Sequence, residues 1–315
     1  MFALCIESSH ARGMGHFFRA LNLVTALKRN GQACKIFINA HEQALNLLEN
    51  SGIRHATVDH ADLESDWEGR IIAREGIRVW INDRLNTDMR HAVHVKHQNI
   101  PLVTFDDRGD GAALADLNIA ALAFDADEAL PGRRVLRGVD YLILNPEIAR
   151  YRRVRQQAGR VLVTLGGSDT YGVTVKVISC LRAAGRTATV IIGPGFRHDT
   201  ELEEVLGPGF EVKRGVSSLI SEFEHYDLAI TGGGITPFEA NASGLPCIVV
   251  ANETFEVPIA LGLVELGGSV FAGHHAEMDE SVLTRDLPVE VMSRAGMEHI
   301  NLEGADRVVR ELMSL

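Results

Sequence analysis

The run "DLAITGGGITPFEANASGLPCIVV", residues 227–250, decides the fold. An apolar strand pattern leads into three glycines, a helix then opens at Thr236 and Pro237, and a second apolar run follows. Proline suits the first turn of a helix because its missing N–H would have no partner there. Strand, turn, helix and strand in this order indicate a βαβ unit, from which parallel sheets are built.

The same alternation runs through the whole chain in two series. The first series has strand patterns at "FALCIES", "CKIFIN", "RVWIND" and "PLVTFDD", a helix over 16–29, and additional short strands at "ADLNIAAL" and "DYLILN". The second has strand patterns at "RVLVTLGGSD", "TATVIIGPG", "FEVKRG", "YDLAITGGG" and "LPCIVVA". Its helices are expected over 172–184 and from near His198, Ser217, Thr236 and Glu256.

These series predict an α/β protein with two doubly wound, Rossmann-type domains facing each other across a cleft. The domains are expected at 1–148 and 158–300, and the polar, basic stretch 146–159 connects them. A last helix within 301–315 is expected to cross back onto the first domain. A chain of 315 residues suits two domains of ordinary size.

The composition of the chain indicates which kinds of binding partner and which cellular compartment to expect. With 31 basic and 42 acidic residues the net charge is −11, which argues against a nucleic-acid partner. The four cysteines are far apart in sequence and predict neither a zinc cluster nor a disulfide framework. The start "MFALCIESSH" lacks the pattern of a signal peptide, and no apolar run has the length of a membrane helix. We therefore expect a cytoplasmic protein without an integral membrane segment.

The first glycine loop, with Gly13, Gly15 and His16, follows the first strand. A dinucleotide fingerprint would need a third glycine where Phe18 stands, so an NAD or FAD site is disfavoured. His16 opens a helix whose positive end disfavours an imidazolium, so its neutral ring either acts as a general base or bonds within its own turn. Arg19, one turn on, either holds an anion or braces the loop.

Glycine loops also follow two strands of the second series. Gly167, with Ser168 and Asp169 as candidate helix caps, suits a phosphate only weakly. The turn from Gly232 to Gly234 is a stronger candidate for a diphosphate. Glu239, one turn into the next helix, could accept both hydroxyls of a ribose.

Acidic residues end two strands of the first series, at Asp83 and at "TFDDRGDG" with Asp106, Asp107 and Arg108. Ion pairs or substrate hydroxyl contacts explain them better than a metal does. His91, His94 and His97 lack a metal-ligand spacing and are expected on the surface. No metal and no separate cofactor are expected.

Together, G-x-G-H-x-x-R after the first strand and G-G-G-x-T-x-x-E-A-x-x-x-G-x-P in the second series resemble a known family. These motifs are similar to those of the nucleotide-sugar hydrolases of pseudaminic acid biosynthesis (PseG) and the spore-coat SpsG proteins, relatives of the MurG-type glycosyltransferases. "TFDDRGDGAALADLNI", "DYLILNPEIARYRR" and "LVTLGGSD" follow in family order. The resemblance implies the GT-B fold, with a sugar or acceptor domain first and a nucleotide domain second.

The resemblance also implies roles for single residues. His16 would be the base or its close partner, and Gly13 and Gly15 would shape the sugar and diphosphate pocket. Gly233, Gly234 and Thr236 would hold the diphosphate, Glu239 the ribose, and Val216, starting the helix after "KRG", would sit by the base. The family commonly has an Asn-Gln pair facing the sugar where this chain has Phe255 and Glu256 in "ANETFEVPIA".

Three functions stay open at this point. The first is a nucleotide-sugar hydrolase, in which water attacks the anomeric carbon and UDP leaves, in nonulosonic acid or surface polysaccharide biosynthesis. The second is a glycosyltransferase of the same fold acting on a separate acceptor. The third is a non-catalytic nucleotide-sugar binding protein. The acidic chain without an evident apolar acceptor loop favours hydrolysis.

Overall fold

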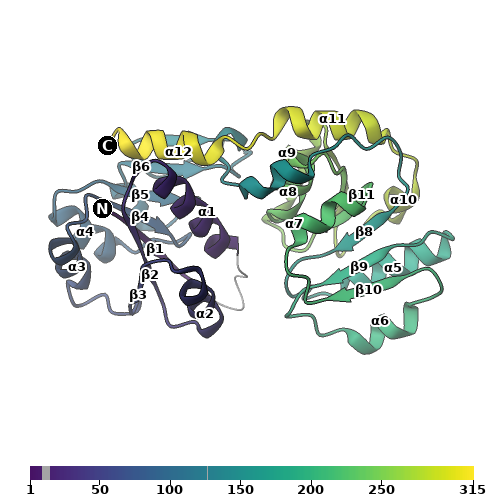
Figure 1. The fold of residues 1–315 in the computed structure, drawn as a ribbon, viewed down its shortest axis with the longest axis horizontal. Helices are drawn as coiled ribbons and strands as arrows, with labels where there is room; N and C mark the ends of the chain where they lie inside the picture. Colours follow the sequence, from purple (N-terminus) through teal and green to yellow (C-terminus); the bar gives the residue numbers. More distant parts are fainter. Residues whose placement is uncertain (9–14, 126) are drawn as a thin grey trace. The chain divides into compact units, whose positions relative to one another are not determined.

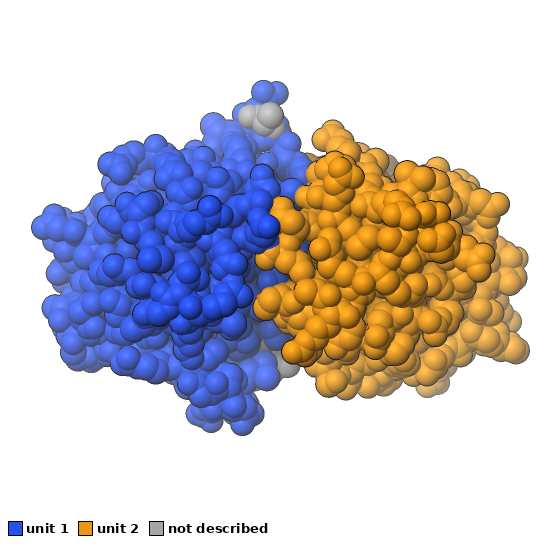
Figure 2. All heavy atoms as spheres, turned by 45° about the horizontal axis from the view of Figure 1, so that its top comes forward, with its two compact units in different colours: residues 1–144, 303–315 blue, residues 145–302 orange. Residues whose placement is uncertain are grey.

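The computed structural model describes residues 1–8, 15–125 and 127–315. The chain forms two compact units, one of residues 1–144 together with 303–315 and one of residues 145–302 (Figures 1 and 2). The passage from the first unit to the second comes at 144/145, and the return comes at 302/303. Each unit is built around its own parallel sheet.

In the first unit, the described residues form a seven-stranded parallel sheet in the order β3-β2-β1-β4-β5-β6-β7. The strands are β1 Phe2–Ile6, β2 Cys34–Ile38, β3 His55–Thr57, β4 Val79–Asp83, β5 Leu102–Phe105, β6 Leu117–Ala120 and β7 Val135–Arg137. The chain order reverses at β1, which pairs with both β2 and β4. The carboxyl ends of β1 and β4 therefore lie side by side at the switch point, where doubly wound sheets bind ligands.

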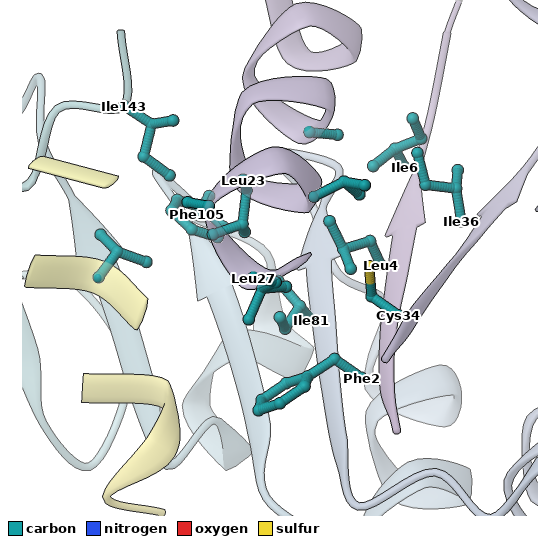
Figure 3. Packing of buried hydrophobic residues seen from close by; sticks show 14 of the residues in the cluster. Phe2, Leu4, Ile6, Leu23, Leu27, Cys34, Ile36, Ile81, Phe105 and Ile143 are labelled. Atoms are coloured by element: carbon teal, nitrogen blue, oxygen red, sulfur yellow. The ribbon is translucent and has the colours of Figure 1, made fainter. Parts of the chain in front are cut away.

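Helices cover both faces of this sheet. They are α1 Gly15–Arg29, α2 Glu42–Ser51, α3 Trp67–Glu75, α4 Met89–His97 and α12 Gly304–Met313, with short 3-10 helices η1 Asp110–Leu114 and η2 Val139–Tyr141. Alternate residues of β1 divide between the faces: Phe2, Leu4 and Ile6 pack with α1, α2 and α12, as Figure 3 shows in part, while Ala3 and Cys5 pack with α3 and α4. The last helix, α12, packs against α1 (Figure 1).

In the second unit, the described residues form a six-stranded parallel sheet in the order β10-β9-β8-β11-β12-β13. Its strands are β8 Val161–Thr164, β9 Thr189–Ile192, β10 Glu211–Arg214, β11 Leu228–Gly232, β12 Cys247–Ala251 and β13 Ser269–His274. Its helices are η3 Pro146–Tyr151, α5 Val173–Ala183, α6 Asp199–Val205, α7 Leu219–Glu222, η4 Phe223–His225, α8 Thr236–Ala242, α9 Glu256–Glu265, α10 Glu280–Thr284 and α11 Val289–His299. The switch point lies between β8 and β11.

The prediction of two parallel α/β sheets is confirmed, but one predicted strand is wrong and three strands, β3, β7 and β13, were not predicted. "DYLILN" was expected to be a strand, but residues 139–141 form η2 and residues 142–145 belong to no helix or strand. Leu142, Ile143 and Leu144 are buried all the same, and α12 packs against η2. The seventh strand is β7, whose side chains are half-buried and whose register pairs it with β6. The apolar run "DYLILN" therefore indicated burial correctly, but the inference that it pairs with a neighbouring strand was wrong.

The four cysteines are free thiols, as expected, and Cys5, Cys34 and Cys247 are buried. Among the described residues, no helix combines the length and the apolar character that crossing a membrane requires.

Candidate functional site

A charged cluster stands at the carboxyl end of the first unit's sheet. His16 and Arg19 lie on the first turns of α1, Asp83 ends β4, and Asp106 follows β5. The three strands β1, β4 and β5 are neighbours in the sheet, so residues 67 and 87 positions apart in sequence come into contact. The sequence had named these residues one by one, and the sheet order brings them together.

Arg19 is the centre of the cluster. Its Nε donates to Asp83 Oδ2 at 2.7 Å, its Nη2 donates to Asp83 Oδ1 at 2.5 Å, and its Nη1 donates to Asp106 Oδ2. The guanidinium also lies 5.0 Å from the centre of the Phe105 ring. Of the two roles left open for Arg19, the structure favours bracing the loop over holding an anion, because all three nitrogens of its guanidinium donate to carboxylates.

The imidazole of His16 is oriented by Asp83. His16 Nδ1 contacts Asp83 Oδ1, and a carboxylate oxygen can only accept, so Nδ1 carries the proton. The approach of Arg19 Nη2 to the same Nδ1, at 3.1 Å, is then a contact between two groups that share Asp83 Oδ1. Among the described residues, none forms a hydrogen bond with His16 Nε2. With the proton on Nδ1, the neutral form of the ring has its lone pair on Nε2, and a general base requires that form.

Electrostatics keep Asp83 ionised. Burial alone would raise the pKa of Asp83, but Arg19 and His16 more than offset it and hold the pKa well below its usual value. Burial likewise opposes the charge of Arg19, and Asp83 and Asp106 raise its pKa above the usual value. Two carboxylates and one guanidinium leave the cluster with an excess of negative charge, which disfavours a phosphate close to it.

The other candidates of the first unit have different surroundings. Asp107 is fully buried, and its oxygens accept from the backbone amides of Thr87 and Gly109 and from the Thr87 hydroxyl, so it supports the loop and is inaccessible to a substrate. Arg108 is half-exposed and pairs with Glu128. Gly15 is the first residue of α1, and a Cβ added there would meet nothing within 4 Å. Gly13 lies outside the described residues.

The glycine turn of the second unit joins β11 to α8. Gly234 is exposed, and a Cβ added to it would meet nothing within 4 Å, so its backbone borders open space. Thr236 is the first residue of α8, with Pro237 behind it as predicted. Gly233 is different, because a Cβ there would lie 2.7 Å from Cβ of Glu256. The turn thus combines an open edge with one closely packed position.

Glu239 lies one turn into α8. Its side chain is partly exposed, and among the described residues it has no hydrogen-bond partner. Desolvation by burial raises its pKa to about 7. A carboxylate without a partner beside a glycine turn is a ready acceptor for ligand hydroxyls, since each oxygen can accept a donor.

The loop after β8 is stabilised by its own residues. Asp169 is buried and accepts from the amides of Val173 and Thr174, both at 2.8 Å, so it caps α5 as expected. Ser168 does not share this role: it is exposed, and its hydroxyl lies 3.3 Å from that of Thr170. Gly167 accepts at its carbonyl from the amide of Gly195, which ties this loop to the one after β9.

Val216 stands before, and not at, the start of its helix. The helix α7 begins at Leu219, and the hydroxyl of Ser218 accepts from the amide of Ser221 as its cap. Val216 is therefore a loop residue between β10 and α7, half-buried. The correction is one of boundary, since the capping serine fixes where the helix can begin.

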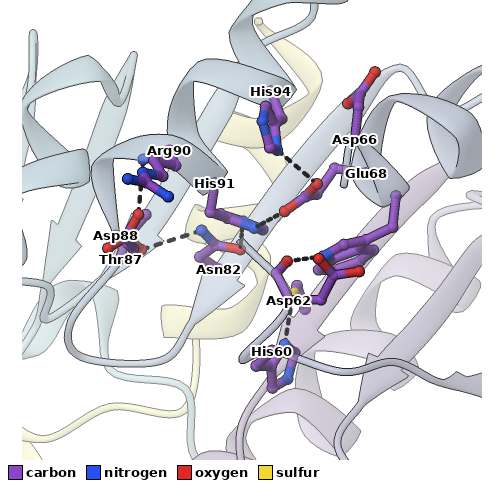
Figure 4. A network of polar contacts seen from close by, with 12 residues as sticks. His60, Asp62, Asp66, Glu68, Asn82, Thr87, Asp88, Arg90, His91 and His94 are labelled. Atoms are coloured by element: carbon purple, nitrogen blue, oxygen red, sulfur yellow. Dashed lines mark hydrogen bonds and ion pairs between the residues drawn. The ribbon is translucent and has the colours of Figure 1, made fainter. Parts of the chain in front are cut away.

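A polar network on the other face of β4 escaped the sequence analysis (Figure 4). His91, expected on the surface, is buried and contacts Glu68 Oε1 through Nδ1 at 2.7 Å. His94 contacts Glu68 Oε2 at 3.0 Å, and only His97 of the three is exposed. Glu68 on α3 is itself fully buried. The sequence of α3 alone gives no sign of a buried carboxylate, because its histidine partners lie on another helix, α4.

The described residues include a group in which Asp66, Glu68 and His94 offer ligand atoms within 4.8 Å of one another. Both oxygens of Glu68 are already engaged by histidines, and Asp66 accepts from the amide of Gly69 as the cap of α3. Hydrogen bonds and helix capping thus hold the side chains of this group in place.

Comparison with known proteins places this architecture. MurG of Acinetobacter baumannii superposes with a TM-score of 0.72 at 12% identity, covering 100% of this chain and 99% of that one. The spinosyn rhamnosyltransferase SpnG in complex with thymidine diphosphate superposes with a TM-score of 0.65 at 15% identity, covering 99% and 100%. The chain has the GT-B fold.

Sequence comparison finds distant relatives. The spore coat polysaccharide biosynthesis protein SpsG of Bacillus subtilis is 21% identical over 282 residues, 85% of this chain and 82% of that protein. The uncharacterized protein MJ1062 of Methanocaldococcus jannaschii is 24% identical over 272 residues, 79% of this chain. The match spans only 55% of MJ1062, so this chain corresponds to about half of that relative. No family model matches the chain.

Proposed function

We propose that this protein is a nucleotide-sugar enzyme whose second unit binds the nucleotide and whose first unit supplies the base. The observation that carries the proposal is the His16–Asp83 pair at the switch point of the first sheet, in which Nε2 of His16 is unengaged by any described residue. A base held in one tautomer by a carboxylate is the arrangement that proton abstraction from water or a hydroxyl needs.

Open glycine backbone is our reason for proposing that the second unit binds the phosphates. The cluster around Arg19 already holds two carboxylates. At the glycine turn of the second unit, the backbone of Gly234 borders open space. Backbone amides bind phosphate oxygens without needing a positive side chain. Glu239, near the same turn and without a partner among the described residues, is suited to the ribose hydroxyls.

The reaction we propose is hydrolysis of a UDP-amino sugar. His16 Nε2 takes a proton from water as its oxygen attacks the anomeric carbon, the bond from that carbon to the phosphate oxygen breaks, and UDP leaves with the electron pair. Asp83 stabilises the imidazolium that forms. The products are UDP and the free sugar, and His16 returns its proton to solvent.

The alternative is transfer of the sugar to an acceptor hydroxyl with the same base. The likeness to SpsG, named for polysaccharide biosynthesis, and to transferases of this fold favours it. The two reactions differ only in which hydroxyl loses its proton to His16. A non-catalytic binding protein would have no use for the oriented imidazole.

Binding is tested by thermal shift with UDP, CDP, GDP and dTDP sugars. A ligand at 100 times its dissociation constant should stabilise the fold by about 2.7 kcal/mol. We expect UDP-amino sugars to give the largest shift, and the Glu239→Gln variant to lose most of it. The proposal would have to be abandoned if none of the nucleotide sugars shifted the melting temperature.

Turnover is tested by NMR detection of free sugar, with and without candidate acceptors. His16→Ala should lower the rate on the order of 10²–10⁴-fold because a general base is lost. His97→Ala, which removes an exposed histidine of α4, is the matched control and should not change the rate. Undiminished turnover in His16→Ala would rule out the assigned base, and a glycosylated acceptor in place of free sugar would decide for transfer.

A further inference from the structure

The side chain of Glu256 occupies a cradle of backbone amides at the carboxyl end of the second sheet. Its Oε2 accepts from the amide of Asn252 at 2.7 Å, from that of Gly233 at 3.3 Å and from that of Glu253 at 3.4 Å. Gly233 follows β11, and the other two amides follow β12. One carboxylate oxygen thus joins two neighbouring loops.

Part of this arrangement is local. Glu256 is the first residue of α9 and reaches back three and four positions to amides that precede the helix, as capping carboxylates do. The bond to Gly233, 23 positions earlier, has no such local reason. It exists because position 233 lacks a side chain: a Cβ there would lie 2.7 Å from Cβ of Glu256. Gly233 and Glu256 fit each other and fix the start of the glycine turn.

The surroundings of Glu256 are poor in compensating charge. Burial raises the pKa of Glu256, the three amides lower it, and Glu253 raises it further. Glu253 is bonded by the hydroxyl of Tyr171 at 3.2 Å, and Tyr171 stacks on His275. On α8, Glu239 is the acidic side chain of the first turn. Lys176 is directed to the carbonyl of His275, so no cation pairs with Glu256 among the described residues.

We infer that Glu256 is a positioning residue of the nucleotide-binding turn and that its carboxylate couples binding of a diphosphate ester to uptake of one proton. The inference rests on the proposed function, because it needs the ligand's diphosphate at the turn of Gly233 and Gly234. An ionised Glu256 repels that diphosphate across a short distance, with desolvation strengthening the repulsion. Protonation removes the repulsion, and the carbonyl oxygen of the neutral acid still accepts the amide of Gly233. The proton comes from solvent and stays on the other carboxyl oxygen while the ligand is bound.

The test is calorimetric binding of UDP-N-acetylglucosamine between pH 5.5 and pH 8. Its diphosphate is a diester, which lacks the titration near pH 6 that a terminal phosphate shows. Titrations in buffers of different ionisation enthalpy count the protons taken up. We expect uptake approaching one proton at the upper end of this range and affinity that falls as pH rises.

Three variants separate charge from shape. Glu256→Gln keeps an oxygen for the amide of Gly233 and should bind on the order of tenfold more tightly at pH 8, without proton uptake. Glu256→Ala removes both features and should bind more weakly than Glu256→Gln at every pH. Glu253→Gln removes a neighbouring charge but no acceptor of these amides, and it should keep the proton uptake. Melting curves without ligand show whether each variant is folded.

The outcomes distinguish this inference from the proposed function. Binding by the unmodified protein without proton uptake, or unchanged uptake in Glu256→Gln, overturns the role of Glu256 and leaves the nucleotide site standing. Absence of binding by any UDP sugar removes the proposed function and this inference with it. If proton uptake disappears in Glu253→Gln and persists in Glu256→Gln, the proton binds to Glu253 and not to Glu256. This outcome also overturns the inference.

Discussion

Replacing Asp83 with asparagine tests the charged cluster at its most connected residue. Asp83 is buried, and its two oxygens accept from His16 and from two nitrogens of Arg19. Asparagine offers one oxygen and one NH₂ group, so whichever way the amide turns, its NH₂ faces a donor. The variant loses at least one charge-assisted hydrogen bond, and Arg19 keeps Asp106 as its carboxylate partner.

The expected loss of stability follows from these contacts. Removing one partner of a buried ion pair costs about 3–5 kcal/mol when the remaining charge has no other partner. Asp106 still compensates Arg19, so we expect about 2–3 kcal/mol, measured by urea unfolding at pH 7. Asp106→Asn is the matched control. It removes the other carboxylate from Arg19 and should cost a similar amount.

The pH dependence has a definite sign. The pKa of Asp83 is depressed in the folded state, because Arg19 and His16 outweigh the effect of burial. Its contribution is therefore present above the unfolded pKa of about 4 and is lost as pH falls from there toward the folded pKa. The difference between the unmodified protein and Asp83→Asn should be complete at pH 7 and shrink below about pH 4. A difference that stays constant down to pH 3 would refute the electrostatic origin.

Activity separates the two variants. Asp83→Asn no longer fixes the tautomer of His16, so turnover should fall on the order of 10²–10⁴-fold. Asp106 does not contact His16, and Asp106→Asn should lose far less. If both variants lost stability and activity to the same extent, the cluster would be acting only as structural support.

Two further predictions concern packing. Gly193→Ala should displace the loop after β8 and weaken nucleotide binding, because its Cβ would lie 2.4 Å from the carbonyl oxygen of Gly167. Gly304→Ala should destabilise the first unit and leave nucleotide affinity unchanged, because its Cβ would lie 2.0 Å from the carbonyl oxygen of Leu142. Calorimetry and melting curves on both variants check this. Arg155→Met should lower the free energy of unfolding by about 2–4 kcal/mol, since the fully buried guanidinium donates to four backbone carbonyls and charged hydrogen bonds contribute about 1.5–3 kcal/mol each, not additively. A urea titration that gave the unmodified midpoint for Arg155→Met would contradict the second prediction.

The fold was readable from the sequence because strand, glycine turn and helix recur with local signals. Most strand patterns and helix starts were found, since apolar runs and caps depend on neighbours in the chain. "DYLILN" shows the limit of this reasoning. An apolar run indicates that its residues are buried, but residues buried under α12 give the same pattern as residues buried in a sheet. Pairing depends on a partner strand, and β7 with its half-buried residues carries no comparable signal.

The sequence could name candidate site residues, but it could not give their geometry. His16 and Asp83 each stood out as a polar residue next to a strand end, but their contact depends on β1 lying beside β4, which the chain order does not state. Glu256 was noticed only as a departure from the family pattern. Its bond to Gly233 joins loops whose proximity also comes from the sheet.

The dipeptide Asn82–Asp83 at the end of β4 shows how one strand end serves two networks. Successive side chains of a strand point to opposite faces, so Asp83 joins the cluster under α1 and Asn82 faces α3 and α4. Trp80 Nε1 can only donate, so the atom of Asn82 that it meets at 2.9 Å is the oxygen. His91 Nε2, 3.1 Å from the same oxygen, must then also donate.

A further proton follows from this orientation. With its Nε2 proton committed to Asn82, His91 meets Glu68 at 2.7 Å through Nδ1, and an acceptor-only carboxylate facing a bare Nδ1 would repel it. One proton must lie between the two groups, whichever of them it is bound to. Burial lowers the pKa of His91 and Glu68 opposes that effect, so the pair holds its proton as a unit. Because this pair and the His16–Asp83 pair lie on opposite faces of the same strand, substitutions in one network should leave the protonation of the other unchanged.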